Sequence, residues 1–175
     1  MSKPGAIRPE IRYILYFAVF WAVLIGVVTY LFDRVDARNN NPNQQLVSHV
    51  RGGATEIELK ANRQGHYLVD GSINNHSVTF ILDTGATTVS ISESVAQKAG
   101  LTRGRPGVAQ TAAGKVKVWS TIIPELRLGD MRFTNVPGTI SPAMDPDMVL
   151  LGMSVLSQLN FTQQSGVLTL SRETQ

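Results

Sequence analysis

Short runs in which apolar and polar residues alternate fill the chain from residue 55 to residue 172, with Gly, Asn, Ser and Pro between them. Such alternation is typical of half-buried β-strands. Strands are expected at 56–59, 66–73, 76–82, 88–91, 108–111, 116–119, 126–128, 131–136, 148–152 and 167–170. Many short strands with close turns predict an all-β fold, a small closed or sandwiched barrel with one or two short helices.

Turn and capping residues support this division. Asn74 and Asn75 separate two strands and predict a hairpin, because Asn tolerates positive φ. A short helix is expected at 92–99, with Ser92 as its N-cap and Gly100 as its stop. A second short helix is expected at 153–159.

The twenty residues 13–32 differ from the rest of the chain because they are almost all apolar and carry no charge. A helix of that length spans about 30 Å, the thickness of the bilayer core, so we expect a transmembrane helix that acts as a signal anchor. One alternative is a buried helix in a soluble core. Another is a cleaved signal peptide, although no Ala-x-Ala cleavage site follows Phe32.

The flanks of this span suggest an orientation and a division into domains. Residues 1–12 carry Lys3, Arg8 and Arg12, which favours a cytoplasmic head and places the rest of the chain outside the cytoplasm. Residues 33–54 include a run of Asn and Gln and are expected to form a flexible polar linker. The folded domain is then expected to occupy residues 55–175.

Composition narrows the classes of function. The net charge is +3, but Lys and Arg are scattered, so we expect no nucleic-acid partner. The chain has no cysteine, which excludes disulfides, thiolate zinc sites and cysteine nucleophiles. His49, His66 and His76 lack the spacing of metal ligands, so neither a metal nor a cofactor is expected.

The apolar run that ends at Leu82 is followed at once by Asp83-Thr84-Gly85-Ala86. A strand that stops there delivers a carboxylate to a tight turn, where backbone amides can surround it. Two such carboxylates in contact cannot both ionise easily, so one serves as general base and the other as general acid. The chain has no second Asp-Thr/Ser-Gly, and a two-fold homodimer would supply the second carboxylate. The alternative is an ordinary strand-end turn with a solvated Asp.

Several segments in order resemble the retropepsin-like aspartic proteases, in particular their bacterial membrane-anchored branch. Residues 79–87 are similar to the active-site segment of these enzymes. Residues 150–156, which begin Leu150-Leu151-Gly152, are similar to their second signature, an apolar pair and a glycine before a helix. Residues 111–116 resemble the flap tip of the bacterial branch; the alternative for 108–123 is a plain surface hairpin.

The resemblance implies a role for each matching residue. Asp83 is the catalytic carboxylate, Thr84 ties the two active-site turns together across the dimer axis, and Gly85 supplies a backbone amide. The flap tip is formed by Ala112, Ala113 and Gly114, and the support beneath the active-site turn by Leu150, Leu151 and Gly152. The terminal strand 167–170 is the candidate dimer contact.

The expected protein is therefore a membrane-anchored, homodimeric aspartic endopeptidase that cleaves a peptide or protein substrate. The resemblance to the Gram-negative branch implies the bacterial inner membrane, with residues 13–32 in the bilayer and the catalytic domain in the periplasm. The alternative is a catalytically silent module of the same fold that only binds or dimerises.

Overall fold

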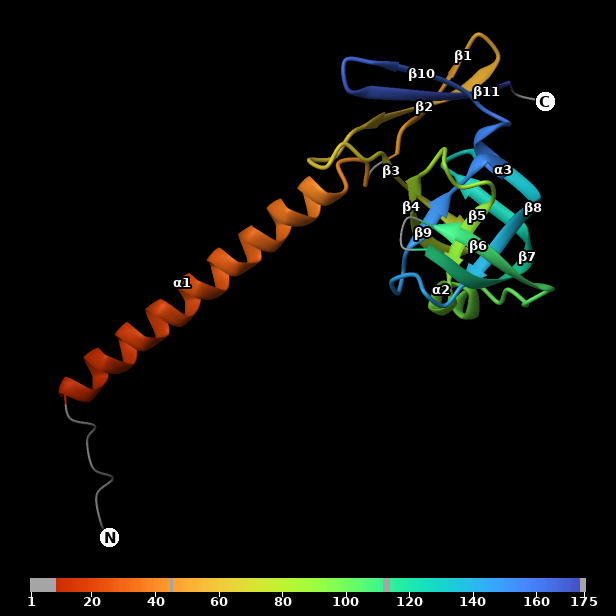
Figure 1. The fold of residues 1–175 in the computed structure, drawn as a ribbon. Coiled ribbons are helices and arrows are strands. Elements are labelled where there is room, and N and C mark those ends of the chain that lie inside the picture. Colours follow the sequence, from red (N-terminus) through yellow and green to blue (C-terminus); the bar gives the residue numbers. More distant parts are fainter. Residues whose placement is uncertain (1–8, 45, 112–113, 174–175) are drawn as a thin grey trace. The chain divides into compact units, whose positions relative to one another are not determined.

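The computed structural model describes residues 9–44, 46–111 and 114–173 of the 175-residue chain. The chain divides into two compact units after Asn40. The first contains the helix α1 (Pro9–Asn40) and the second contains all of the strands (Figure 1).

The helix α1 includes the whole apolar segment 13–32. The described side chains in this segment are exposed, among them Phe17, Val23 and Phe32. Within the part of the chain that the structure describes, no helix has the combined length and apolar character needed to cross a membrane. The structure therefore does not bear out the transmembrane helix predicted at 13–32.

Four strands at the two ends of the second unit form one antiparallel sheet. They are β1 (Ser48–Arg51), β2 (Ala54–Lys60), β10 (Asn160–Gln164) and β11 (Val167–Glu173). Their order is β1-β2-β11-β10, so β11 pairs on both sides and β10 lies at an edge (Figure 1).

The remaining strands form a seven-stranded sheet in the order β3-β4-β9-β5-β8-β7-β6, and β3 also pairs with β7 over three residues. Its members are β3 (Leu68–Ile73), β4 (His76–Leu82), β5 (Val89–Ser92), β6 (Pro106–Thr111), β7 (Gly114–Leu128), β8 (Met131–Ser141) and β9 (Val149–Leu151). Two short helices, α2 (Glu93–Lys98) and α3 (Met153–Leu156), complete the unit. A mostly β fold with short helices is confirmed. The strands are divided between two sheets, and the pairing of β3 with β7 joins the first strand of the larger sheet to its sixth.

The local signals in the sequence explain the turns and the first short helix. Asn74 and Asn75 have φ values of 48° and 65°, which lets them turn β3 into β4 without a glycine. The Ser92 side chain accepts a hydrogen bond from the amide of Val95 and caps α2. Gly100 follows the helix with φ of 67°, the left-handed conformation that ends many helices.

One hydrophobic core joins the two sheets and the short helices. It includes Phe80 on β4, Phe133 on β8, Leu151 on β9 and Leu170 on β11, each at most 1% exposed. Burying side chains of this size contributes about 1.5–3 kcal/mol each. This core holds rigid the ends of β4 and β9, from which the candidate site is built.

The folded unit begins earlier than the predicted residue 55, because Asn43 is buried within it. Its side-chain amide donates to the carbonyls of Lys60 and Leu68, and its side-chain oxygen accepts from the amide of Lys60. This segment was predicted to be a flexible linker because Asn, Pro and Gln bury little apolar area. Asn43 is held instead by hydrogen bonds to the backbone. The pattern of hydrophobic residues in the sequence gives no information about such bonds.

Candidate active site

Asp83 lies immediately after β4, beside the end of β9. The two strands run parallel, with Leu82 opposite Leu151. The amide of Asp83 continues this pairing and donates to the carbonyl of Leu151 at 3.1 Å. Because both strands are anchored in the core, the position at which the chain turns away is fixed.

The turn that follows Asp83 folds back onto its carboxylate. The amide of Gly85 donates to Oδ1 of Asp83 at 2.8 Å, and the amide of Ala86 donates to the Asp83 carbonyl at 3.2 Å. Asp83 and Ala86 are partly buried, whereas Thr84 and Gly85 are exposed. The turn therefore orients one carboxylate oxygen through a backbone amide and leaves the hydroxyl of Thr84 on the surface.

Gly152 lies directly against this turn. A Cβ placed on Gly152 would come within 2.2 Å of the Thr88 carbonyl oxygen and 2.6 Å of that of Ala86. Just beyond it, the amide of Met153 donates to the Ala86 carbonyl at 2.8 Å, and that of Ser154 donates to the Thr87 carbonyl at 3.0 Å. The start of α3 thus binds the backbone of the Asp83 turn, and no residue larger than glycine fits at the contact.

Leu150 and Leu151 face opposite sides of the sheet because successive side chains of a strand alternate. Leu151 is fully buried in the core, whereas Leu150 is half-buried. Leu150 pairs with Ile81 on β4 and with Ser90 on β5, both of which are also partly exposed. Leu151 therefore supports the site from below, and Leu150 lies on the more accessible face.

The predicted flap is the hairpin of β6 and β7. Ala112 and Ala113 lie outside the described residues. Gly114 has φ of 110°, a conformation that an L side chain rarely adopts, and the hydroxyl of Thr111 donates to its carbonyl at 2.8 Å. At the base of the hairpin, the guanidinium of Arg103 lies 4.0 Å from the ring centroid of Trp119. Trp119 therefore packs under a cation, as expected for a residue that supports the hairpin.

A cavity of about 270 Å³ adjoins Asp83 and Thr84. Its remaining lining comes from Tyr67, Leu82, Leu156, Phe161, Gln163, Leu168 and Leu170. Asp83 is the one carboxylate among these lining residues. Tyr67, Phe161 and Gln163 were not predicted from the sequence to belong to the site. Of these three, Phe161 could have been noticed in the sequence, because it is an aromatic residue within a polar run.

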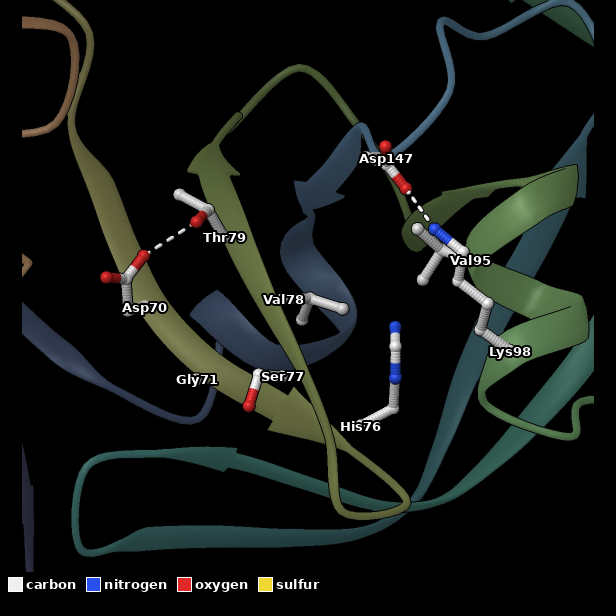
Figure 2. Close-up of a pocket in the computed structure, with 9 residues that line it drawn as sticks. All are labelled: Asp70, Gly71, His76, Ser77, Val78, Thr79, Val95, Lys98 and Asp147. Atoms are coloured by element: carbon white, nitrogen blue, oxygen red, sulfur yellow. Dashed lines mark hydrogen bonds and ion pairs between the residues drawn. The ribbon is translucent and has the colours of Figure 1, made fainter. Parts of the chain in front are cut away.

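A larger cavity of about 600 Å³ lies between β3, β4 and α2 and does not include Asp83 (Figure 2). Its carboxylates already have partners. Oδ1 of Asp70 accepts from the hydroxyl of Thr79 at 2.7 Å, and Asp147 forms an ion pair with Lys98 at 2.7 Å. We therefore assign the candidate chemistry to the smaller cavity, where the carboxylate is oriented by a backbone amide.

The described residues contain no group of three or more His, Cys, Asp or Glu side chains that could hold a metal ion. Among the described residues, the site therefore offers the oriented carboxylate of Asp83 and the backbone turn around it. Such a group serves in acid–base chemistry.

Comparison with known proteins agrees with this geometry. The family described as "gag-polyprotein putative aspartyl protease" matches residues 69–158, just over half of the chain. A solved structure of a retropepsin-like aspartic protease from Rickettsia conorii is 26% identical, with a TM-score of 0.57, and the match covers 73% of this chain and 94% of that one.

Two curated relatives are described as uncharacterized proteins. One, from the cobV 5′ region of a Sinorhizobium species, is 26% identical over 70% of this chain, and the chain spans 54% of its length. The other, RP867 of Rickettsia prowazekii, is 26% identical over 86% of this chain and 68% of its own length. The family match covers β3 to α3, and with it both segments that form the Asp83 site, so the chain belongs to the gag-polyprotein aspartyl protease family and is a retropepsin-like protein.

Proposed function

We propose that this protein is an aspartic endopeptidase whose catalytic dyad is formed by Asp83 from two copies of the chain. The observation that carries the proposal is the hydrogen bond of 2.8 Å from the Gly85 amide to Oδ1 of Asp83, at the end of a strand anchored in the core. This arrangement orients one carboxylate and exposes the turn that holds it.

One copy of the chain provides half of such a site. In the dyad, the ionised carboxylate of one Asp83 removes a proton from a water molecule, and the water oxygen attacks the carbonyl carbon of the peptide. The protonated carboxylate of the other Asp83 donates its proton to the carbonyl oxygen. When the tetrahedral intermediate collapses, the C–N bond breaks and the nitrogen leaves as an amine after receiving a proton from the dyad.

The other residues of the site support this reaction. Thr84 is exposed beside Asp83, and its hydroxyl is available to bind the turn of the second copy. Gly114 gives the tip of the hairpin a backbone conformation that suits a flap over a bound peptide. Leu82, Leu156 and Leu170 line the cavity beside the carboxylate, and these apolar side chains suit an extended peptide with apolar side chains.

The test is cleavage of a peptide library by the full chain and by Asp83→Asn. We expect Asp83→Asn to lower the cleavage rate by about 100-fold or more, because the general base and acid are lost together. Asp130→Asn changes an exposed carboxylate in the turn between β7 and β8 and should cleave as the wild type does. Equal cleavage by Asp83→Asn would contradict the proposal. A wild-type dimer that binds peptides without cleaving them would identify a binding module instead.

We further propose that α1 associates with the bacterial inner membrane and that the folded unit acts on the periplasmic side. The support is the uncharged sequence 13–32, whose described side chains are exposed in α1 and would gain about 25 cal/mol per Å² of apolar surface removed from water. Cell fractionation with an alkaline wash should leave the protein with the membranes, and protease added to the periplasm should digest residues 41–175. Recovery of the intact protein in the wash would contradict membrane association.

A further inference from the structure

The strand β4 is paired along its length on one side but only in part on the other. On one side it pairs with β3 from His76 to Ile81. On the other side, the strand β9 pairs only with Phe80, Ile81 and Leu82. Among the described residues, no strand lies against this second side between His76 and Thr79. The first half of β4 therefore keeps a free edge, although β4 has a neighbour on each side in the order of the sheet.

The free edge carries backbone groups that have no strand to bind. In an antiparallel pair, alternate residues direct their N–H and C=O groups to the partner. The amide of Leu82 donates to the carbonyl of Tyr67, just before β3, at 3.0 Å, so the even-numbered residues of β4 bond to that side. Ser77 therefore directs its N–H and C=O away from β3, and Thr79 directs its N–H the same way. An extended chain placed there would hydrogen-bond to these groups.

This edge opens into the cavity of about 600 Å³ that Figure 2 shows. Ligand-binding sites commonly have volumes of about 300–1,000 Å³, so the cavity has room for a short stretch of peptide. Val78 lines it on the β4 side, and Val95 and Lys98 of α2 line the opposite wall. The residues that line it and those that line the smaller cavity beside Asp83 are different, so the two are separate sites.

Contacts of α2 hold the opposite wall in place. Lys98 forms an ion pair with Asp147 at 2.7 Å, and Oγ of Ser94 accepts from the Asp147 amide at 3.3 Å. The side-chain amide of Asn74 donates to the carbonyl of Ala99, just after the helix, at 3.0 Å. The helix is thus tied both to the loop before β9 and to the hairpin turn before β4, so the cavity is pre-formed.

Asp70 gives this cavity a negative charge without a neighbouring cation. Its Oδ1 accepts from the hydroxyl of Thr79 at 2.7 Å and from the side-chain amide of Asn41 at 2.9 Å, and both donors are neutral. The ion pairs among the described residues do not include Asp70, whereas the other carboxylate of the cavity, Asp147, is paired with Lys98. A ligand with a positive charge therefore complements this lining.

We propose that the cavity binds an extended segment of another polypeptide that carries a lysine or an arginine. The backbone of the segment pairs with Ser77 and Thr79 and continues the sheet at β4, a recurring mode of peptide recognition. Its basic side chain reaches Asp70, and the side chains of its other face pack against Val78 and Val95. The site needs one copy of the chain and no cleavage, so it goes beyond the proposed function and does not depend on it.

The first test measures the charge preference with two peptides, acetyl-Thr-Val-Arg-Val-Thr-amide and the same peptide with Gln in place of Arg. The protein is the full chain carrying Asp83→Asn in an uncharged detergent, and mass spectrometry verifies that the peptides stay intact. In calorimetric titrations we expect the Arg peptide to bind about fivefold more tightly, the scale of an exposed ion pair. Asp70→Asn should abolish this difference, whereas the control Asp130→Asn, at an exposed carboxylate outside the cavity, should keep it.

The second test locates the bound peptide. The chain contains no cysteine, so Ser77→Cys introduces a single thiol at an exposed position on the free edge. A saturating concentration of the Arg peptide should slow alkylation of this thiol by N-ethylmaleimide severalfold, because the peptide covers the edge. Alkylation of Val50→Cys, on the exposed strand β1 of the other sheet, should not change.

The third test addresses the backbone pairing and needs no variant of the cavity. One peptide carries N-methyl groups on both valines, and a second carries them on the arginine and both threonines. Alternate residues of an extended chain present their N–H groups to opposite edges, so each methylated peptide keeps one edge intact. We expect one of the two to bind as the unmodified Arg peptide does and the other to lose measurable binding.

Each measurement has a result that overturns the proposal. These results are failure of the Arg peptide to bind at millimolar concentration, unchanged alkylation of Ser77→Cys, equal binding of the two methylated peptides, and a preference for Arg that survives Asp70→Asn. The proposed function is judged separately. If Asp83→Asn cleaves peptides as wild type does, the aspartic protease proposal fails, whereas binding at the β4 edge stands on its own measurements.

Discussion

Gly152 and Ala86 are in such close contact that a Cβ on the glycine would come within 2.6 Å of the alanine carbonyl oxygen. The contact joins the residue before α3 to the turn that carries Asp83. We expect Gly152→Ala to push this turn away and to lower the free energy of unfolding by about 1–3 kcal/mol. We also expect the rate of peptide cleavage to fall under conditions in which the variant is still folded. Thermal unfolding and peptide cleavage measure the two effects.

Gly107→Ala is the matched control for Gly152→Ala, since a Cβ there would meet its nearest neighbour, Val118, at 3.9 Å. Its stability should remain within about 0.5 kcal/mol of wild type. If Gly152→Ala changes neither the stability nor the activity, the close contact between Gly152 and the Asp83 turn is not needed for either.

The hydroxyl of Ser154 connects three elements. It accepts from the Val89 amide on β5 at 3.1 Å and donates to the Pro137 carbonyl on β8 at 2.9 Å. Ser154→Ala leaves both backbone groups without this partner, so we expect a loss of about 1–3 kcal/mol in the free energy of unfolding. Ser157→Ala removes a hydroxyl that bonds only within its own helical turn, and it should change little in the same denaturant titration.

Asn43 is expected to anchor the start of the folded unit. Asn43→Ala removes three hydrogen bonds to the backbone of Lys60 and Leu68, and we expect a loss of about 2–4 kcal/mol. Asn43→Asp keeps the acceptor for the Lys60 amide but replaces the donor with a carboxylate that faces two carbonyls. It should therefore also destabilise, and more at pH 7 than at low pH. If both variants are as stable as wild type, Asn43 does not anchor the start of the folded unit, and the segment around it behaves as a linker.

Gly114 tests the hairpin tip. No described atom beyond its chain neighbours lies within 4 Å of a Cβ placed on Gly114, so the effect expected of Gly114→Ala is the strain of a side chain at φ of 110°, about 1–2 kcal/mol. Gly100→Ala introduces a similar strain at φ of 67° without crowding, and serves as the control. If the tip closes over the peptide, Gly114→Ala should raise KM or lower kcat, whereas Gly100→Ala should affect stability alone. If the two variants have the same kcat and KM, the tip of the β6–β7 hairpin does not act as a flap.

Glu125 provides a pH-dependent contribution to stability. The hydrogen bond from Arg127, at 2.6 Å, lowers the pKa of Glu125 below its usual value of 4.5, and the charges of Arg127 and Arg132 act in the same direction. A lowered folded-state pKa stabilises the protein above the unfolded pKa, and this contribution disappears as the pH falls through the folded pKa. We therefore expect Glu125→Gln to be less stable than wild type at pH 7 and the difference to shrink below pH of about 4.5.

The Arg127→Gln background offers a check on that assignment. With the principal hydrogen-bond donor removed, Glu125→Gln should change the pH dependence of unfolding less than it does in the wild-type background. An identical change in both backgrounds would show that Arg127 does not control the ionisation of Glu125.

Much of the local structure was readable from the sequence because short-range chemistry decides it. The alternating pattern predicted the β3–β4 hairpin, and Asn74 and Asn75 provided the turn because their side chains permit positive φ. Ser92 and Gly100 marked the ends of α2 through capping and left-handed geometry. Asp83 was recognisable for the same reason, as a carboxylate placed directly after an apolar strand.

Two strands were missed because their own sequences carry no clear signal. In β1 and β10 most residues are polar, and each strand exists because it pairs with a neighbour, β2 or β11. The hydrogen bonds of such a strand are satisfied by residues distant in the sequence, so a local pattern does not reveal them. The same limitation explains why Asn43 looked like part of a linker.

The sequence by itself determined the family, the catalytic candidate and the pair of segments around Asp83 and Gly152, since each depends on residue types at fixed local spacing. Only the tertiary structure decided that Gly152 touches Ala86, that β11 lies inside its sheet and that β10 remains free beside Asp83. These relationships depend on which strands pair over long distances, and that pairing is set by the packing of the whole core.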